Sequence, residues 1–150
     1  MTTIPAQFEH TLSAFPDKAA VFRGSESLTF RQLHAEAVAA AQALASLGVL
    51  PGDRVGICMQ KTLDQVVAIL GVLWANAIFV PIHPVLHAEQ IGHMVDDCDM
   101  KFLITDSTRI AEFRDAAHGR IVIGRGPAEE EFPSLQKLRR ECSAALRNRR

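Results

Sequence analysis

The sequence predicts an α/β fold with a layered, mostly parallel sheet and flanking helices. Short apolar runs alternate with amphipathic stretches of about ten residues, which is the pattern of parallel βαβ units. The chain has 150 residues, of which 48% are hydrophobic and 22% are charged. This length and composition are typical of one globular domain with a buried core, and they exclude collagen-like, low-complexity and disulfide-scaffold proteins.

The first 30 residues predict a short helix followed by a hairpin. Three apolar side chains spaced four and three apart share one face of a helix over residues 6–15. Two short strands, residues 19–22 and 27–28, then flank Gly24 and Ser25. Glycine suits a tight turn because it adopts positive φ at little cost, so we expect a β-hairpin here.

A second helix is predicted over residues 30–47, with a signal at each end. Thr29 and Gln32 form a Thr-x-x-Gln capping box, in which each side chain satisfies a backbone donor that the helix start leaves unpaired. Apolar side chains recur three and four residues apart along the helix. Gly48 stands where a left-handed C-cap is expected.

Strands and helices alternate along the rest of the chain. Residues 55–59 form a continuous apolar run, typical of a strand buried on both faces. The next helix, residues 63–74, is apolar all round, so we expect one face to pack on the sheet and the other to need a layer from outside residues 1–150. The further elements expected are a strand at 77–82, a helix at 88–97, a strand at 102–104, a helix at 107–117, a strand at 121–123 and a last helix around 135–146.

Charge divides the chain into two parts. Overall, 16 Lys and Arg face 17 Asp and Glu, so the net charge of −1 recruits neither nucleic acid nor an anionic membrane. Residues 137–150, however, hold six basic side chains and one acid. We interpret them as a solvated helix face without buried partners, running into a frayed end. The expected organisation is an α/β part over residues 1–123, then a linker and a charged helix or tail over residues 124–150.

Three features of the sequence bear on the cellular compartment and on insertion into a membrane. The three cysteines lie far apart without a C-x-x-C pair, so neither a disulfide framework nor a zinc knuckle is indicated. The first residues lack the basic and apolar regions of a cleaved signal, so a reducing cytoplasm is expected. Residues 66–82 carry no charge, but Gly71, Asn76 and Pro81 interrupt them. A buried helix and strand explain this segment better than a membrane span.

The sequence contains two groups of side chains that could bind a metal ion, and a simpler interpretation fits each of them better. His83, His87, His93 and Cys98 lack tight tetrahedral spacing, so loop and surface histidines are favoured over a zinc site. Four aspartates could suggest a magnesium pocket, but most of them follow a predicted helix and not a strand, so solvated charge is favoured. They are Asp96, Asp97, Asp99 and Asp106.

Residue chemistry alone identifies no active site. Residues 124–126 (GRG) lack the third glycine and the following helix that a phosphate-binding loop needs. No Gly-x-Ser-x-Gly elbow is present, and no nucleophile stands beside an oriented base. The expectation is therefore no catalytic residue and no metal ligand within the chain, and the sequence leaves cofactor-binding residues unassigned.

The order of motifs nevertheless resembles that of the adenylate-forming superfamily. Residues 28–33 (LTFRQL) resemble its first core motif, L-T-Y-x-E-L, and residues 47–55 (LGVLPGDRV) are similar to its L-G-V-x-x-G-D-x-V segment. Residues 73–84 (LWANAIFVPIHP) resemble the second core motif, L-K-A-G-A-x-Y-V-P-L-D-P. The resemblance covers about residues 8–123. Asn76 replaces a glycine of the motif, and asparagine is a residue that tolerates a left-handed backbone.

The resemblance implies the N-terminal subdomain of an AMP-forming ligase, of the acyl-CoA synthetase or peptide-synthetase type. Residues 79–84, 88–90 and 96–98 resemble the exosortase-associated acyl-CoA ligases more than the peptide synthetases. The complete enzyme would use ATP and Mg²⁺ on a small carboxylic acid, as in fatty acid activation, with CoA or the phosphopantetheine of an acyl carrier protein as acceptor. The family's phosphate loop and catalytic lysine are not found in residues 1–150, so the chain alone is expected to be inactive. The alternatives are a stand-alone nucleotide-binding or receiver-like module, or an adaptor that uses the basic tail.

Overall fold

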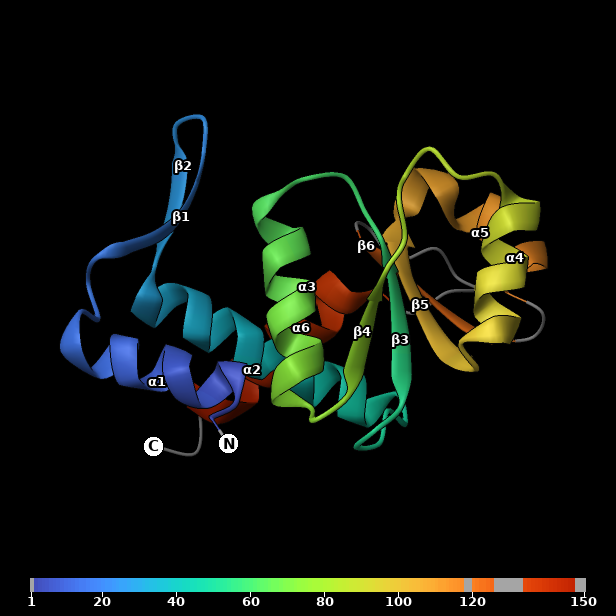
Figure 1. Cartoon of the computed structure of the whole chain (residues 1–150). Coiled ribbons are helices and arrows are strands. Elements are labelled where there is room, and N and C mark those ends of the chain that lie inside the picture. The colour runs from blue at the N-terminus through green and yellow to red at the C-terminus, as the bar shows by residue number, and fades with distance from the viewer. Residues whose placement is uncertain (1, 118–119, 126–133, 148–150) are drawn as a thin grey trace.

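The computed structural model describes residues 2–117, 120–125 and 134–147, and it contains a four-stranded parallel sheet. The strand order is β4-β3-β5-β6, and every pair in it is parallel. The predicted α/β class is therefore confirmed (Figure 1). The strands are β3 (Arg54–Cys58), β4 (Ile78–Pro81), β5 (Met100–Asp106) and β6 (Ile121–Arg125).

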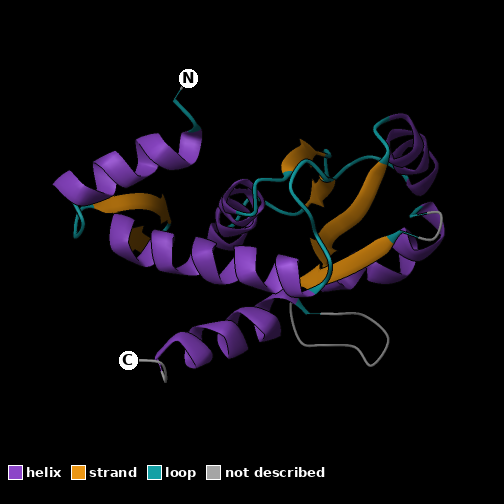
Figure 2. Ribbon diagram, turned by 90° about the horizontal axis from the view of Figure 1, so that it is seen from below, coloured by secondary structure: helices purple, strands orange, loops and turns teal. Residues whose placement is uncertain are grey.

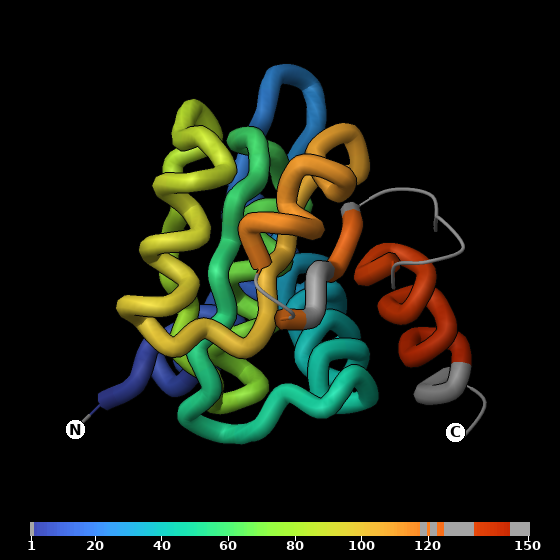
Figure 3. The backbone as a smooth tube through the Cα atoms, turned by 90° about the vertical axis from the view of Figure 1, so that its right-hand side faces the viewer, coloured from blue at the N-terminus to red at the C-terminus, as the bar shows by residue number. Residues whose placement is uncertain are grey.

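Helices cover both faces of this sheet. One face packs against α2 (Phe30–Ser46), α3 (Leu63–Trp74) and α6 (Leu135–Arg147), around a core that includes Val55 and Ile104. The other packs against α4 (Ala88–Asp97) and α5 (Ile110–Ala116), around Leu103 and Phe113. Figure 3, viewed from the side of α4 and α5, shows these two helices in front of the sheet. Burial on both faces explains the continuous apolar segments within β3 and β5, residues 55–58 and 102–104.

The N-terminal segment forms a separate layer beside the sheet. Helix α1 (Ile4–Ala14) and the antiparallel hairpin of β1 (Ala19–Arg23) and β2 (Glu26–Thr29) contact α2 and α3. The Phe8 ring lies 5.3 Å from the rings of both Phe30 and Trp74, measured between centroids. Aromatic contacts of this kind fix the layer on the two helices.

The predicted caps are present. Thr29 Oγ1 accepts from the amide of Gln32, and the Gln32 side chain accepts from the amide of Thr29, which completes the capping box of α2. Gly48 has φ of +96° after the helix. Asn76 has φ of +56°, so the asparagine does adopt the left-handed turn that the motif's glycine would supply.

The expectation that α3 needs a layer from outside the chain is wrong. No side chain of α3 is classed as exposed, because α1, α2 and the hairpin cover the face that turns away from the sheet. The close approach of α2 depends on Gly71, where an added Cβ would lie 2.6 Å from the Cβ of Ala40. The apolar helix is thus buried within the chain's own layers.

The expectation for the basic tail is wrong at one residue. Helix α6 packs along α2 (Figure 2), with Leu135 only 3% exposed in the core. Arg139 has a side chain 13% exposed and two acidic partners, whereas Lys137 and Arg140 are exposed as expected. A period of 3.6 residues turns one basic side chain inward and its neighbours outward.

Two predicted boundaries also move. β5 spans Met100–Asp106 and not only 102–104, because hydrogen bonding on both sides extends a central strand. The helix predicted over 107–117 begins as a 3₁₀ turn, Ser107–Arg109, before α5, since Ser and Thr hydroxyls compete with the helical backbone. Within the described ranges, no helix is both long and apolar enough to cross a membrane.

Candidate functional site

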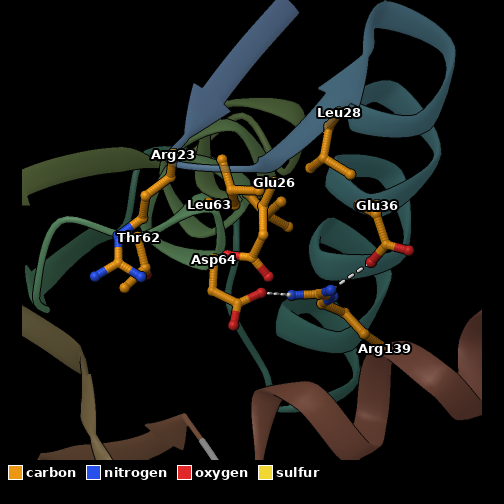
Figure 4. A pocket seen from close by; sticks show the side chains of 9 residues that line it. Arg23, Glu26, Leu28, Glu36, Thr62, Leu63, Asp64 and Arg139 are labelled. Carbon is orange, nitrogen blue, oxygen red and sulfur yellow. Dashed lines mark hydrogen bonds and ion pairs between the residues drawn. The ribbon is translucent and has the colours of Figure 1, made fainter. Parts of the chain in front are cut away.

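A charged pocket of about 280 Å³ lies where the hairpin, α2, α3 and α6 meet (Figure 4). The hairpin and α2 are consecutive in the sequence, and the tertiary fold brings them together with α3 and with the distant α6 to form the pocket. Its lining residues are Arg23, Glu26, Leu28, Glu36, Thr62, Leu63, Asp64, Val67 and Arg139.

Arg139 organises this pocket. Its Nη1 donates to Asp64 Oδ1 over 3.4 Å, and its Nη2 donates to Glu36 Oε2. The Glu36 and Asp64 side chains are 40% and 24% exposed, so both carboxylates keep some contact with water. Arg139 Nε is buried and has no hydrogen-bond partner within the described residues. The guanidinium therefore joins α6 to α2 and α3, and each of its two carboxylate partners already has a cation.

The remaining pocket groups carry charge without catalytic geometry. Arg23 and Glu26 are cross-strand neighbours in the hairpin, and Thr62 Oγ1 is occupied by capping α3 through the amide of Gln65. Among the lining residues none is a nucleophile held by an oriented base, which is the arrangement that covalent catalysis needs. The pocket thus marks the junction of these elements.

The carboxyl edge of the sheet offers the second candidate, since open α/β sheets bind ligands where neighbouring strands send their helices to opposite faces. Here that point lies between β3 and β5, which are followed by α3 and α5 on opposite faces. The amide of Gln60 donates to Asp106 Oδ2 over 2.8 Å across this point. Thr105 Oγ1 is buried and has no hydrogen-bond partner within the described residues. The chain's own hydrogen bond thus spans the crevice.

Arg109 fixes the loop that follows β4 at the same edge. Its guanidinium donates to the carbonyls of Pro84 (2.6 Å) and Leu86 (3.1 Å) and pairs with Glu112 at 2.9 Å. It also lies 3.5 Å from Cys58 Sγ. Burial nevertheless raises the pKa of the Cys58 thiol, and this outweighs the nearby cation. Cys58 is therefore not a poised nucleophile.

The three histidines considered as metal ligands lie within α4 or in the loop that precedes it. His83 Nδ1 accepts from the amide of Val85 over 3.3 Å, and His87 is the N-cap residue of α4. His93 lies within α4. Over the part of the chain that is described, no three His, Cys, Asp or Glu side chains form a set that could hold a metal ion.

The four aspartates are spread over the end of α4 and the end of β5. Asp96 and Asp97 end α4, and Asp99 follows in a left-handed turn with φ of +48°. Asp106 is the last residue of β5. Of the GRG segment, Gly124 and Arg125 end β6, while residue 126 lies outside the described residues.

No local pattern in the sequence predicts the pocket around Arg139. The two carboxylates that this side chain binds lie 75 and 103 residues away along the chain. No local spacing signals such a set, and the one cue available is the amphipathic period of α6.

The sequence matches a known protein family over most of its length. The sequence pattern of the family described as AMP-binding enzyme matches residues 8–146. The chain belongs to this AMP-binding enzyme family. A similar protein is the probable non-canonical nonribosomal peptide synthetase CymA of Salinispora arenicola, at 38% identity over 106 residues, which cover 71% of this chain and 1% of CymA.

Solved structures of AMP-binding enzymes share the fold. The anthranilate CoA ligase AuaEII, in complex with anthranoyl-AMP, superposes with a TM-score of 0.79 at 28% identity, over 89% of this chain and 27% of that one. The N-terminal subdomain of Klebsiella oxytoca NpsA gives a TM-score of 0.78 at 20% identity, over 95% and 33%. This chain therefore corresponds to about a quarter to a third of those chains, and to a much smaller part of the synthetase.

Proposed function

We propose that this chain is the N-terminal part of an AMP-forming acyl-activating ligase. The complete enzyme would join a carboxylic acid to AMP with release of pyrophosphate, then transfer the acyl group to the thiol of CoA or of a carrier protein. The family match over residues 8–146 carries this proposal. We keep the division into an α/β part over residues 1–123 and a linker and charged helix over residues 124–150, and the described part of that helix, α6, packs on α2.

Among the residues that the structure describes, no set fits the ATP phosphates or Mg²⁺. Glu36 and Asp64 both pair with Arg139, and the amide of Gln60 donates to Asp106. Phosphate binding needs backbone amides or cations directed at one point. We therefore assign no reaction step to this chain, and propose that it supplies the sheet, the loop held by Arg109 and the helices that support the nucleotide site.

The proposal extends to the thiol that accepts the acyl group and to the cellular compartment of the protein. Similarity to a peptide synthetase and to a CoA ligase supports both acceptor types. Three free cysteines, at positions 58, 98 and 142, suit a reducing cytoplasm.

The test is to express the reading frame continued past Arg150, where a Gly-rich segment ending in Pro-Lys-Gly is expected. That longer protein should form hydroxamate from ATP, hydroxylamine and one acid in a panel of aryl, fatty and amino acids. A stop codon after Arg150 in this gene, together with nucleotide binding by the 150-residue chain, would favour the stand-alone nucleotide-binding module instead.

A further inference from the structure

Arg109 connects the carboxyl ends of three neighbouring strands. It follows β5 in the turn Ser107–Arg109, and its guanidinium reaches Cys58 at the end of β3 and the loop between β4 and α4. Figure 1 shows this loop at the end of the sheet where α5 begins. Open α/β sheets bind ligands outside the carboxyl ends of their strands, so Arg109 acts on the edge where a ligand is expected.

Every donor of the guanidinium is used. An arginine side chain carries five N–H donors, and Arg109 makes five hydrogen bonds. Two of them go to the carbonyls of Pro84 and Leu86 in the loop. Two go to the carboxylate of Glu112, and one goes to the thiol of Cys58. The planar group therefore has one orientation that satisfies all its partners.

The side chain is anchored on α5. Glu112 stands three residues after Arg109, and the Arg109 Cζ lies 4.9 Å from the centroid of the Phe113 ring. Phe113 is fully buried, so this cation–π contact rests on the core. Lysine could not reproduce the arrangement, because its ammonium has three donors and no planar fork.

The backbone of the loop divides its hydrogen bonds between itself and Arg109. The amides of Val85 and Leu86 donate within the loop, to Nδ1 and to the carbonyl of His83. The carbonyls of Pro84 and Leu86 accept from Arg109 instead. The internal bonds shape the loop, and the bonds to Arg109 fix it relative to the strand ends.

We propose that Arg109 is a positioning residue, which holds the loop of residues 83–87 in one conformation before a ligand binds. This role rests on the proposed function, because the loop belongs to the part of the chain that supports the nucleotide site of the complete ligase. A loop that adopts its binding conformation only part of the time lowers the apparent affinity by that fraction. Arg109 therefore sets KM through the loop and has little effect on kcat.

The positioning is tested on the 150-residue chain by NMR relaxation. In the wild type, the ¹⁵N order parameters of residues 85–87 should equal those of β3, near the rigid value of about 0.85. Arg109→Lys should lower them below about 0.6 and leave β3 unchanged. Arg31→Lys is the matched control, since Arg31 is 64% exposed in its pair with Asp17, and it should leave the loop unchanged.

A second measurement needs no variant, in case Arg109→Lys does not fold. The Nη protons of wild-type Arg109 should give separate signals, because bonds to carbonyls and a carboxylate hinder rotation about the Cζ–Nη bonds. Averaged signals from a rotating guanidinium would overturn the proposal. Order parameters of residues 85–87 that are low in the wild type, or that do not respond to Arg109→Lys, would overturn it as well.

The effect on binding is tested in the protein extended past Arg150, by hydroxamate formation. Arg109→Lys should raise KM for the acid or for ATP by about tenfold and change kcat by less than about twofold. Unchanged KM values beside an active wild type would overturn this inference and leave the proposed function standing. An extended wild type that is inactive with every acid would overturn the proposed function and, with it, the role of Arg109 in binding.

Discussion

Arg139 on α6 donates a hydrogen bond to Asp64 on α3 over 3.4 Å, although 75 residues of chain separate them. The same guanidinium binds Glu36 on α2, so a single side chain joins three helices. This inward basic side chain attaches α6 to the body of the molecule together with the apolar contacts of Leu135 and Leu138.

Arg139→Ala should therefore destabilise the fold by about 1–3 kcal/mol. This lies between the small effect of an exposed pair and the larger one of a buried pair, because Glu36 and Asp64 keep some water. The thermal midpoint should fall by about 2–4 °C for each kcal/mol in a chain of this size. Arg140→Ala, at an exposed position of the same helix, is the control. Equal midpoints for the two variants would show that α6 does not depend on Arg139.

Gly71→Ala should destabilise the pair of helices α2 and α3, although alanine favours helix. The new Cβ would lie 2.6 Å from the Cβ of Ala40, so the helices must separate, at a cost of about 1–3 kcal/mol. Combining it with Ala40→Gly should recover part of that loss. Denaturant unfolding of the single and double variants measures this coupling, and strictly additive effects would contradict the close contact.

Cys58 should resist alkylation in the native chain. It is 1% exposed, and burial raises the pKa of its thiol, so little thiolate meets the reagent. Cys98 and Cys142 are partly exposed and should react at least about tenfold faster with iodoacetamide at pH 8. Peptide mass spectrometry over a time course gives the three rates. A Cys58 rate equal to the others would place its thiol at the surface.

Asp53 should contribute stability that depends on pH. Lys101 Nζ donates to its carboxylate over 2.8 Å and the amide of Leu50 donates to it over 2.9 Å, and these bonds lower the pKa of Asp53. Because the folded value lies below the unfolded one, the contribution is complete above the unfolded pKa of about 3.9 and is lost as pH falls through the folded value.

Asp53→Asn should accordingly lower the denaturant midpoint at pH 7, and the difference from wild type should close as the pH falls through the folded pKa of Asp53. Asp17→Asn is the control, since its side chain is 79% exposed in its pair with Arg31. A difference for Asp53→Asn that stayed constant from pH 7 to acid would assign the effect to packing and not to the carboxylate.

Local patterns predicted most of the fold, because its elements carry local signals. The capping box at Thr29, the glycine C-cap and the apolar run of β3 each depend on neighbours within a few residues. The cover of α3 was not predictable in the same way. It depends on the length and position of α1 and the hairpin, and on a helix contact at Gly71, which periodicity does not report.

The charged pocket was not predictable for a related reason. The positions of Arg139, Glu36 and Asp64 in the sequence form no local motif. Only the packing of α6 on α2 brings the three side chains together. Family resemblance did predict the AMP-binding enzyme family from residues 28–33, 47–55 and 73–84, but a fold alone assigns no chemistry to them.

The proposal that this chain is the N-terminal part of an acyl-activating ligase, and is inactive alone, is tested most directly by carboxylate-dependent exchange of pyrophosphate into ATP. The purified 150-residue chain should show no exchange above a mock purification, because electrostatic stabilisation of the transferring group supplies the largest part of such catalysis, and the sequence does not contain the phosphate loop that the resemblance leads us to expect. The protein extended past Arg150 should exchange with its acid. Turnover that scales with the amount of the purified 150-residue chain would contradict the account.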